Sequence, residues 1–482
     1  MIIHNDSVDL LTTAVPPLQE QRSVLRQLRS ELLRLYRPHI QEDPGPIRLM
    51  ARLVAELELE CRKRNIAQEV IRSEIVNRTI GDVNLRQITE CEGTAGGPND
   101  YRLLADEIGI ALPGEQLCGY TATGETYLWL RQQMMECERL LLAHNYDPRM
   151  YDIYGMGNPL LREWLAQYMQ QQWGLPTTWE QLYLGLGAMD SIDKVLRGLA
   201  HRYRAQNIPN FGILFPEPGF AVPEWQARSY GYQLHCFPTR EEDRFKLTAE
   251  QLDQQLQASP NIQLIYLTVT NNPTTFAYSA NELDALHTVL RHYRENGRPI
   301  LLLADLAYIG TGKPADDLAR MTTFMPADVW QHTILVSSYS KTCSLTGERL
   351  GWVVCGDPKI ATAISPSWSN STATLPGEWQ LRFMAYHRLL QERPWLMDKL
   401  RNFYRLRRQR LIAQLRDINA QQHLFIEIYL DDDATVYNWS KLAAGEDAFS
   451  LFEKTGIASV PGSGFGYSDE YIRCSIGCIP VT

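Results

Sequence analysis

The sequence predicts an α/β fold built on a mostly parallel sheet, and three observations support this class. Short apolar runs of strand length fill the middle of the chain. They alternate with stretches of helix length, which is typical of βαβ units whose helices cover both faces of a parallel sheet. Polar residues directly follow several of the runs, where ligands collect in such sheets. The predicted strands cover residues 210–215, 232–237, 262–269, 299–305, 333–338 and 350–356.

The segments outside these strands are largely helical. Leucines recur at three- and four-residue steps in residues 17–72, which predicts helix with an interruption near 37–46. This segment could be an arm, a partner-binding helix or the start of a subdomain; a helix packed on its own body or on a dimer mate is the commonest role. Residues 73–125 are glycine-rich and irregular, and 378–417 predict two helices or one kinked at Pro394. Further predictions are helices at 125–142 and 280–296 and a closing α+β segment that ends in a strand-like stretch at 470–477.

The composition excludes several classes of protein. The 482 residues are 44% apolar, enough for a large core and two to three domains or subdomains. The net charge of −9 argues against nucleic-acid or anionic-membrane partners. Nine cysteines are scattered without a CxxC pair, so we expect no zinc knuckle and no disulfide framework, but free thiols in a reducing cytoplasm. We expect neither a signal peptide nor a membrane span.

Two strand ends carry the most specific chemistry. Asp305 ends the fourth predicted strand, and a partly buried aspartate is costly unless it meets a cation; capping the next helix is the ordinary alternative. Lys341 follows the fifth strand. A lysine in a cationic or dehydrated site has a lowered pKa, and its free amine can form a Schiff base with an aldehyde. Ser338, Ser340 and Arg349 could hold a phosphate beside it, whereas a solvated surface lysine would need no such neighbours.

Three further loops present polar or aromatic groups. The stretch 183–196 carries a glycine loop that turns into a helix, an arrangement that binds anions, although it lacks a P-loop lysine and Rossmann spacing. Asn272 follows the third predicted strand and could donate to a ligand oxygen, with Pro273 stiffening the loop; a plain turn is the alternative. Phe220 could lie flat on an aromatic ligand or simply pack in the core.

In this order, these stretches resemble the class I/II aminotransferases, the fold-type I enzymes that use pyridoxal 5′-phosphate (PLP). The resemblance runs from about residue 78 to the C-terminus, and the lysine stretch with an Asp-x-x-Tyr upstream is its most specific part. The motifs are YGMGNPLLREWLA, GLGAMDSIDKVL, FPEPGF, NNPTT, DLAY, SSYSKTCSLTGERLGW and YIRCSIG.

The resemblance implies a large domain, with a mostly parallel seven-stranded sheet sandwiched by helices, and a smaller α+β domain formed by both chain ends. The divisions it implies are an N-terminal helical arm at 1–44, the N-terminal part of the small domain at 45–125, the large PLP-binding domain at 126–359 and the C-terminal part of the small domain at 360–482.

The resemblance also assigns roles to residues at the cofactor ring. Lys341 would bind PLP as a Schiff base and later move the substrate proton, and Asp305 would pair with the pyridine nitrogen and keep it protonated. Tyr308 and Asn272 would hydrogen-bond the 3-oxygen of the ring, and Phe220 would stack on its face. The catalytic candidates are Lys341, Asp305 and Tyr308.

Other candidates would hold the phosphate and the substrate. The phosphate group would lie against Ser338, Ser340, Arg349 and the backbone of Gly187, Ala188 and Met189. Arg473 would clamp the substrate α-carboxylate in two-pronged geometry. Gly81, rather than Gly114, would cover that carboxylate, and Tyr154 or Tyr151 would reach the phosphate of the neighbouring subunit. We therefore count Arg473, Asn272, Gly81 and Tyr154 as substrate-binding candidates, with no metal. The sequence departs from the family at Thr275, where glycine is usual, and at Met189, where a polar residue often contacts phosphate.

The function that follows is a PLP-dependent aminotransferase acting on an L-amino acid and a 2-oxo acid, as a cytoplasmic homodimer with shared active sites. The alternative uses the same lysine for elimination, decarboxylation or cyclisation, as a lyase or cyclase in a specialised biosynthetic pathway. A third interpretation, a transcription regulator with an N-terminal DNA-binding domain, is disfavoured because residues 1–100 hold 13 basic and 15 acidic residues.

Overall fold

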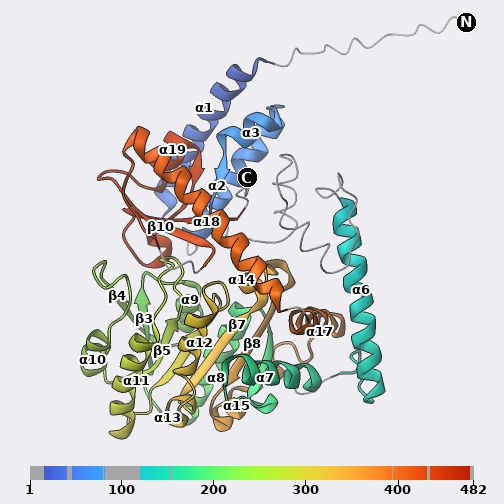
Figure 1. Ribbon diagram of the computed structural model, residues 1–482. Helices are drawn as coiled ribbons and strands as arrows, with labels where there is room; N and C mark the ends of the chain where they lie inside the picture. Colours follow the sequence, from blue (N-terminus) through green and yellow to red (C-terminus); the bar gives the residue numbers. More distant parts are fainter. Residues whose placement is uncertain are drawn as a thin grey trace, which may run out of the picture.

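The computed structural model describes residues 16–40, 46–79, 81, 120–151, 155–392, 394–430 and 435–477. They form two lobes, which Figure 1 shows one above the other. The large lobe is a seven-stranded sheet with the helices that cover it. The small lobe combines the N-terminal helices with the C-terminal strands, so that both ends of the described chain meet there. No helix of the described residues is long and apolar enough to cross a membrane.

The large-lobe sheet has the order β2-β8-β7-β6-β5-β3-β4, and only β8 runs antiparallel to its neighbours. The predicted α/β class with a mostly parallel seven-stranded sheet is therefore confirmed. The strands are β2 (Leu182–Leu186), β3 (Gly212–Glu217), β4 (Gln233–Pro238), β5 (Ile262–Thr268), β6 (Leu301–Asp305), β7 (Thr333–Ser338) and β8 (Leu350–Cys355).

Both faces of this sheet are buried, because alternate side chains of each strand enter two different cores. In β6, Leu301 and Leu303 pack on one face, and Leu302 and Ala304 pack on the other. This explains why the strands appear in the sequence as unbroken apolar runs. The helices that cover one face are α7 (Pro159–Trp173), α10 (Ala249–Ala258), α11 (Ala280–Glu295), α12 (Pro314–Thr322), α13 (Ala327–Trp330) and α17 (Gly377–Glu392). On this side α6 (Tyr120–Ala143) packs on α17. The helices that cover the other face are α8 (Ala188–Ala205), α9 (Val222–Ser229), α15 (Pro358–Ile364) and α16 (Pro366–Ser369).

The sequence did not predict β2, the edge strand that leads into the glycine loop. Its glycine, Gly185, weakens the strand signal. In the structure Gly185 is required by packing, because a Cβ there would lie 2.2 Å from the Ser191 hydroxyl of α8. The close approach of α8 to β2 therefore explains a residue that the local pattern disfavours.

The small lobe is built on a second, antiparallel sheet of order β12-β13-β10-β9. It lies against α18, the helix that links the two lobes (Figure 1). Of the two predicted alternatives, the structure has two helices, α17 and α18, and Pro394 is the N-cap of the second. The elements are α18 (Trp395–Gln422), β9 (Phe425–Ile428), β10 (Tyr437–Leu442), α19 (Ala448–Thr455), β11 (Ile457–Ala458), β12 (Val460–Pro461), a short 3₁₀ helix η5 (Gly462–Phe465) and β13 (Tyr471–Ser475).

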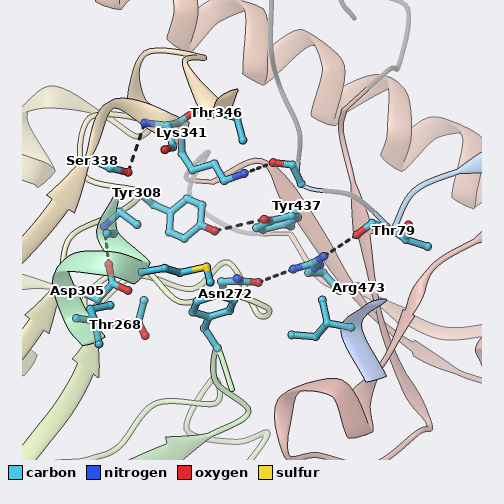
Figure 2. A pocket seen from close by; sticks show the side chains of 18 of the residues that line it. Thr79, Thr268, Asn272, Asp305, Tyr308, Ser338, Lys341, Thr346, Tyr437 and Arg473 are labelled. Carbon is cyan, nitrogen blue, oxygen red and sulfur yellow. Dashed lines mark hydrogen bonds between the residues drawn. The ribbon is translucent and has the colours of Figure 1, made fainter. Parts of the chain in front are cut away.

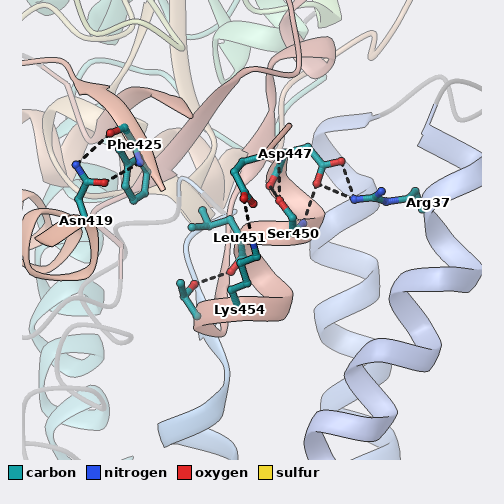
Figure 3. A network of polar contacts seen from close by, with 9 residues as sticks. Arg37, Asn419, Phe425, Asp447, Ser450, Leu451 and Lys454 are labelled. Atoms are coloured by element: carbon teal, nitrogen blue, oxygen red, sulfur yellow. Dashed lines mark hydrogen bonds and ion pairs between the residues drawn. The ribbon is translucent and has the colours of Figure 1, made fainter. Parts of the chain in front are cut away.

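The N-terminal helices belong to the core of this lobe. They are α1 (Leu18–Tyr36), the 3₁₀ turn η1 (Arg37–Ile40), α2 (Pro46–Lys63) and α3 (Gln68–Glu74), followed by β1 (Val76–Asn77), which pairs in parallel with β11. Apolar residues of α1, α2 and α3 share one cluster with Phe449 and Phe452 of α19. At the end of α1, Arg37 donates to both carboxylate oxygens of Asp447, the N-cap of α19, at 2.8 and 2.7 Å (Figure 3). The predicted boundaries at 44/45, 125/126 and 359/360 stay predictions.

Candidate active site

A cavity of about 510 Å³ lies between the two lobes (Figure 2). The large lobe contributes the carboxyl ends of β5, β6 and β7 and the start of α8, while the small lobe contributes α2, β10 and β13. The predicted site residues that line it are Gly81, Ala188, Met189, Phe220, Asn272, Asp305, Tyr308, Ser338, Ser340, Lys341, Arg349 and Arg473. Gly187 lies directly behind Arg349, Tyr151 is exposed, and Tyr154 lies outside the described residues.

Asp305 is the last residue of β6 and is 4% exposed. Its two carboxylate oxygens accept from the Tyr266 hydroxyl at 2.7 Å and from the backbone N–H of Ala307 at 2.9 Å. Burial raises the pKa of Asp305, and these two donors only partly offset that effect. The carboxylate is thus held in one orientation but lacks a cation, which a protonated ring nitrogen would provide. Tyr266 was not predicted, because nothing in a strand pattern marks its hydroxyl.

Lys341 lies on the short helix α14 (Tyr339–Thr342), which begins where β7 ends. The Ser338 side chain accepts from the N–H of Ser340 at the start of this turn, and the Tyr404 hydroxyl donates to the carbonyl of Lys341 at 2.7 Å. The lysine amine crosses the cavity and donates to the carbonyl of Gly81 (Figure 2). Local turn geometry therefore positions the backbone of Lys341, while its amine is free to exchange a backbone carbonyl for another partner.

A glycine-lined cradle surrounds Arg349. Gly187 has φ +85°, and a Cβ on it would lie 2.3 Å from the Arg349 guanidinium. A Cβ on Gly351 would lie 2.5 Å from the Gly187 carbonyl carbon, so both glycines are needed for this close approach. Arg349 donates to the carbonyl of Thr346 at 2.9 Å and to the Ser340 hydroxyl at 3.5 Å, and has no carboxylate partner among the described residues. The cradle thus presents a cation, hydroxyls and the start of α8, a donor set that suits a phosphate.

Arg473 lies on β13 and is 3% exposed. It donates to the Asn272 side-chain oxygen at 3.0 Å and to the Thr79 carbonyl at 2.8 Å, and its Nε has no partner in the structure. It forms no ion pair with a described residue. A buried, uncompensated guanidinium is strongly unfavourable. This arrangement fits a site that receives a carboxylate.

The loops around the cavity explain one departure from the family pattern. Thr275, buried behind Asn272, has φ +72°, a conformation that glycine adopts readily and a β-branched residue rarely does. Its N–H donates to the carbonyl of Asn271 at 3.0 Å, and the Asn271 side chain donates to the carbonyl of Pro218 at 2.9 Å, near Phe220. The tight turn is therefore kept without glycine, and it connects the loops that carry Asn272 and Phe220.

Sequence reasoning missed Tyr437 of β10, which is central to the cavity (Figure 2). Its hydroxyl lies 3.4 Å from that of Tyr308, and the Arg473 guanidinium carbon lies 4.1 Å from the centre of its ring. Burial alone would raise the pKa of Tyr437, but the cationic Lys341 and Arg473 beside it bring the pKa below its ordinary value. A Cβ on Gly81 would lie 2.0 Å from this hydroxyl, which gives a packing reason for glycine there. Arg48, Thr79, Thr268 and Thr346 also line the cavity and were not predicted.

The lowered pKa of Tyr437 predicts a distinct spectroscopic titration. In the cofactor-free protein, tyrosinate absorbance near 295 nm should show a component below pH 10 that Tyr437→Phe removes, because the neighbouring cations favour the ionised phenol. In the control variant Tyr168→Phe this component should remain, since burial raises the pKa of Tyr168 to about 12. Superimposable curves for wild type and Tyr437→Phe below pH 10 would contradict the prediction.

Known proteins match both the sequence and this geometry. The family model described as aminotransferase class I and II matches residues 127–480. The chain is 26% identical over 345 residues to an asparagine–oxo-acid transaminase of Streptococcus mutans, covering 68% of this chain and 79% of that protein. It is 26% identical over 333 residues to an LL-diaminopimelate aminotransferase of Dehalococcoides mccartyi, covering 66% and 77%. The fold is similar to that of an aspartate aminotransferase from Thermus thermophilus with maleate, at a TM-score of 0.63 and 19% identity over 91% of this chain and 94% of that one.

The chain therefore belongs to the class I and II aminotransferase family, with the fold-type I architecture of these PLP-dependent enzymes. It is a transferase of nitrogenous groups, and this confirms the family resemblance that the sequence motifs indicate.

Proposed function

We propose that this protein transfers the amino group of an L-amino acid to a 2-oxo acid, with PLP held at Lys341. The observation that carries the proposal is that Lys341, Asp305 and Arg473 line one cavity. Relatives named for asparagine, LL-diaminopimelate and aspartate support an amino acid as the donor. When bound, PLP supplies an electron sink that makes the α-proton of an amino acid removable.

The residues on the large-lobe side would hold the cofactor. Asp305, fixed by Tyr266 and Ala307, would place its carboxylate against a ring nitrogen and keep that nitrogen protonated. Tyr308 and Asn272 would donate hydrogen bonds to the ring oxygen, and Phe220 would cover a ring face. The phosphate would be held by Ser338, Ser340, Arg349 and the backbone of Gly187, Ala188 and Met189 at the start of α8.

The residues on the opposite side would hold the amino acid. Arg473 would exchange its neutral partners for the α-carboxylate, which supplies the missing negative charge for its guanidinium. The amine of Lys341, released from the Gly81 carbonyl, would take the α-proton and return it at the next stage. Tyr437, between Lys341 and Arg473, would orient that amine, and Gly81 would lie over the carboxylate of the amino acid.

A panel of single amino acids tests this function. The PLP-loaded protein is mixed with one amino acid at a time, in the absence of an acceptor. Transamination is expected to release one equivalent of 2-oxo acid per active site and to leave the pyridoxamine form of the cofactor. Release of ammonia, carbon dioxide or a cyclised product with unchanged cofactor would instead support the lyase or cyclase alternative and overturn the proposal.

We further propose a cytoplasmic homodimer with shared active sites. Its support is apolar exposure on and after α6: Met135 and Leu142 lie seven residues apart on this helix, and Met150 and Tyr151 follow it, with exposed fractions from 50% to 70%. Described cysteines such as Cys137 and Cys355 are free thiols, which suits a reducing compartment. Light scattering after size exclusion should give twice the chain mass of 55.2 kDa.

A further inference from the structure

We propose that Arg48 binds a negatively charged group on the substrate side chain, so that the enzyme prefers acidic amino acids to their uncharged analogues. This inference rests on the proposed function and names the substrate class of the same cavity. It starts from a charge imbalance. Although the whole chain has a net charge of −9, the described residues that line the cavity include four cations, Arg48, Lys341, Arg349 and Arg473, and one acid, Asp305, which gives these residues a formal charge of +3 (4 − 1).

None of the four cations has a carboxylate partner among the described residues. Lys341, Arg349 and Arg473 donate to backbone carbonyls or neutral side chains, whereas Arg48 has neither a hydrogen bond nor an ion pair within the described chain. The phosphate of the cofactor accounts for Arg349 and the α-carboxylate for Arg473. Lys341 would be committed to the cofactor through its covalent bond. Arg48 therefore remains as a cation without an anion.

The position of Arg48 relates it to the substrate rather than to the phosphate. It lies in the first turn of α2, and the preceding residue, Ile47, packs against an apolar cluster that contains Phe465 of the small lobe and also residues of the large lobe. The guanidinium carbon of Arg473 lies 5.0 Å from the centre of the Phe465 ring. Arg48 and Arg473 thus line the cavity from neighbouring parts of the small lobe, whereas the phosphate cradle belongs to the large lobe.

The surroundings of Arg48 favour a substrate side chain that has a negatively charged end and aliphatic carbons before it. The first turn of α2 contains no acidic residue, and the positive end of the helix dipole lies there, so the helix itself favours an anion beside Arg48, whose side chain is exposed. Ile47 and Ala51, one turn apart on the same helix, also line the cavity and offer apolar contact for methylene groups. An amino acid with a carboxylate at the end of a short aliphatic side chain matches both features.

The test compares each acidic amino acid with its own carboxamide. Glutamate is paired with glutamine and aspartate with asparagine, and kcat/KM is measured for wild type, Arg48→Gln and the control Arg52→Gln, an exposed arginine one turn along α2 that does not line the cavity. Loss of one charge-assisted contact should lower kcat/KM for the acids about 10- to 100-fold, mainly through KM. The values for the amides should stay within about two-fold of wild type, and Arg52→Gln should behave as wild type.

A binding measurement provides a readout that does not depend on turnover. Calorimetry on the PLP-loaded protein should show that glutarate binds at least about 10-fold more tightly than butyrate. Arg48→Gln should remove this difference in affinity and should leave the affinity for butyrate unchanged. Three outcomes would overturn the proposal for Arg48 and leave the proposed function intact. Arg48→Gln could lower kcat/KM equally for acids and amides, or it could leave the ratio of the two values unchanged. The wild-type enzyme could also accept only amino acids with uncharged side chains. Failure of the proposed function would instead appear as no 2-oxo acid from any amino acid, and the glutarate comparison would then still decide the role of Arg48.

Discussion

Replacing Lys341 with alanine should lower transaminase turnover by at least about 10,000-fold, because the same amine would both hold the cofactor and move the substrate proton. The variant should still fold, since its short helix is held through the Ser338 hydroxyl and the backbone carbonyl of residue 341, neither of which changes. Borohydride reduction of the PLP-treated protein, followed by peptide mass analysis, should place a pyridoxyl group on Lys341 in wild type and none at this position in the variant.

The matched control is Lys359→Ala, which removes an exposed lysine at the start of α15, away from the cavity. It should keep wild-type turnover and full labelling of Lys341. If Lys341→Ala retained turnover within about 10-fold of wild type, or if the label in wild type appeared on another lysine, the assignment of Lys341 would be wrong.

Replacing Asp305 with asparagine should have opposite effects on activity and on stability. The amide has the same shape but cannot keep a ring nitrogen protonated, so turnover should fall about 100- to 10,000-fold. In the cofactor-free protein, burial raises the pKa of Asp305, so folding disfavours the charged form. The stability cost of this charge is therefore absent at low pH and grows as pH rises through the range between the unfolded and folded pKa values of the carboxyl. Asp305→Asn should remove it.

Thermal unfolding of the cofactor-free proteins at pH 5 and pH 8 checks the stability part. The midpoint of Asp305→Asn should exceed that of wild type, and the difference should be larger at pH 8. Tyr266→Phe is the matched control at the same carboxylate: it keeps the charge but removes one hydrogen bond, so it should reduce turnover far less than Asp305→Asn. Asp305→Asn with wild-type turnover, or with a cofactor-free form less stable than wild type, would contradict this account.

The family motifs identify most of the cavity wall, because the residues that form it lie at the ends of strands. The carboxyl ends of parallel strands share one edge of a sheet, so Asn272, Asp305 and Ser338 had to meet once their strands were identified. Tyr437 and Arg48 could not be found in this way. They reach the cavity from a strand and a helix of the small lobe, whose positions depend on how the two ends of the chain pack together.

Thr275 and β2 show the same limit at the level of the backbone. A threonine at a position of positive φ and a glycine-containing edge strand both contradict local propensity. Each is explained by a contact outside its own element: the Pro218 loop held by Asn271 beside the turn, and α8 packed closely on Gly185 of β2. Local patterns are therefore least informative where tertiary contacts determine the backbone.

The sequence by itself determined the α/β class, the strands from β3 to β8 and the lysine-centred chemistry, because side-chain period and residue type act locally. Only the tertiary structure decided which polar groups meet across the two lobes: the unpaired Nε of Arg473, the phenol of Tyr437 beside Lys341, and Arg48, which has no partner among the described residues. The physical reason is that burial and charge balance are properties of the assembled cavity, and no segment of the chain contains them on its own.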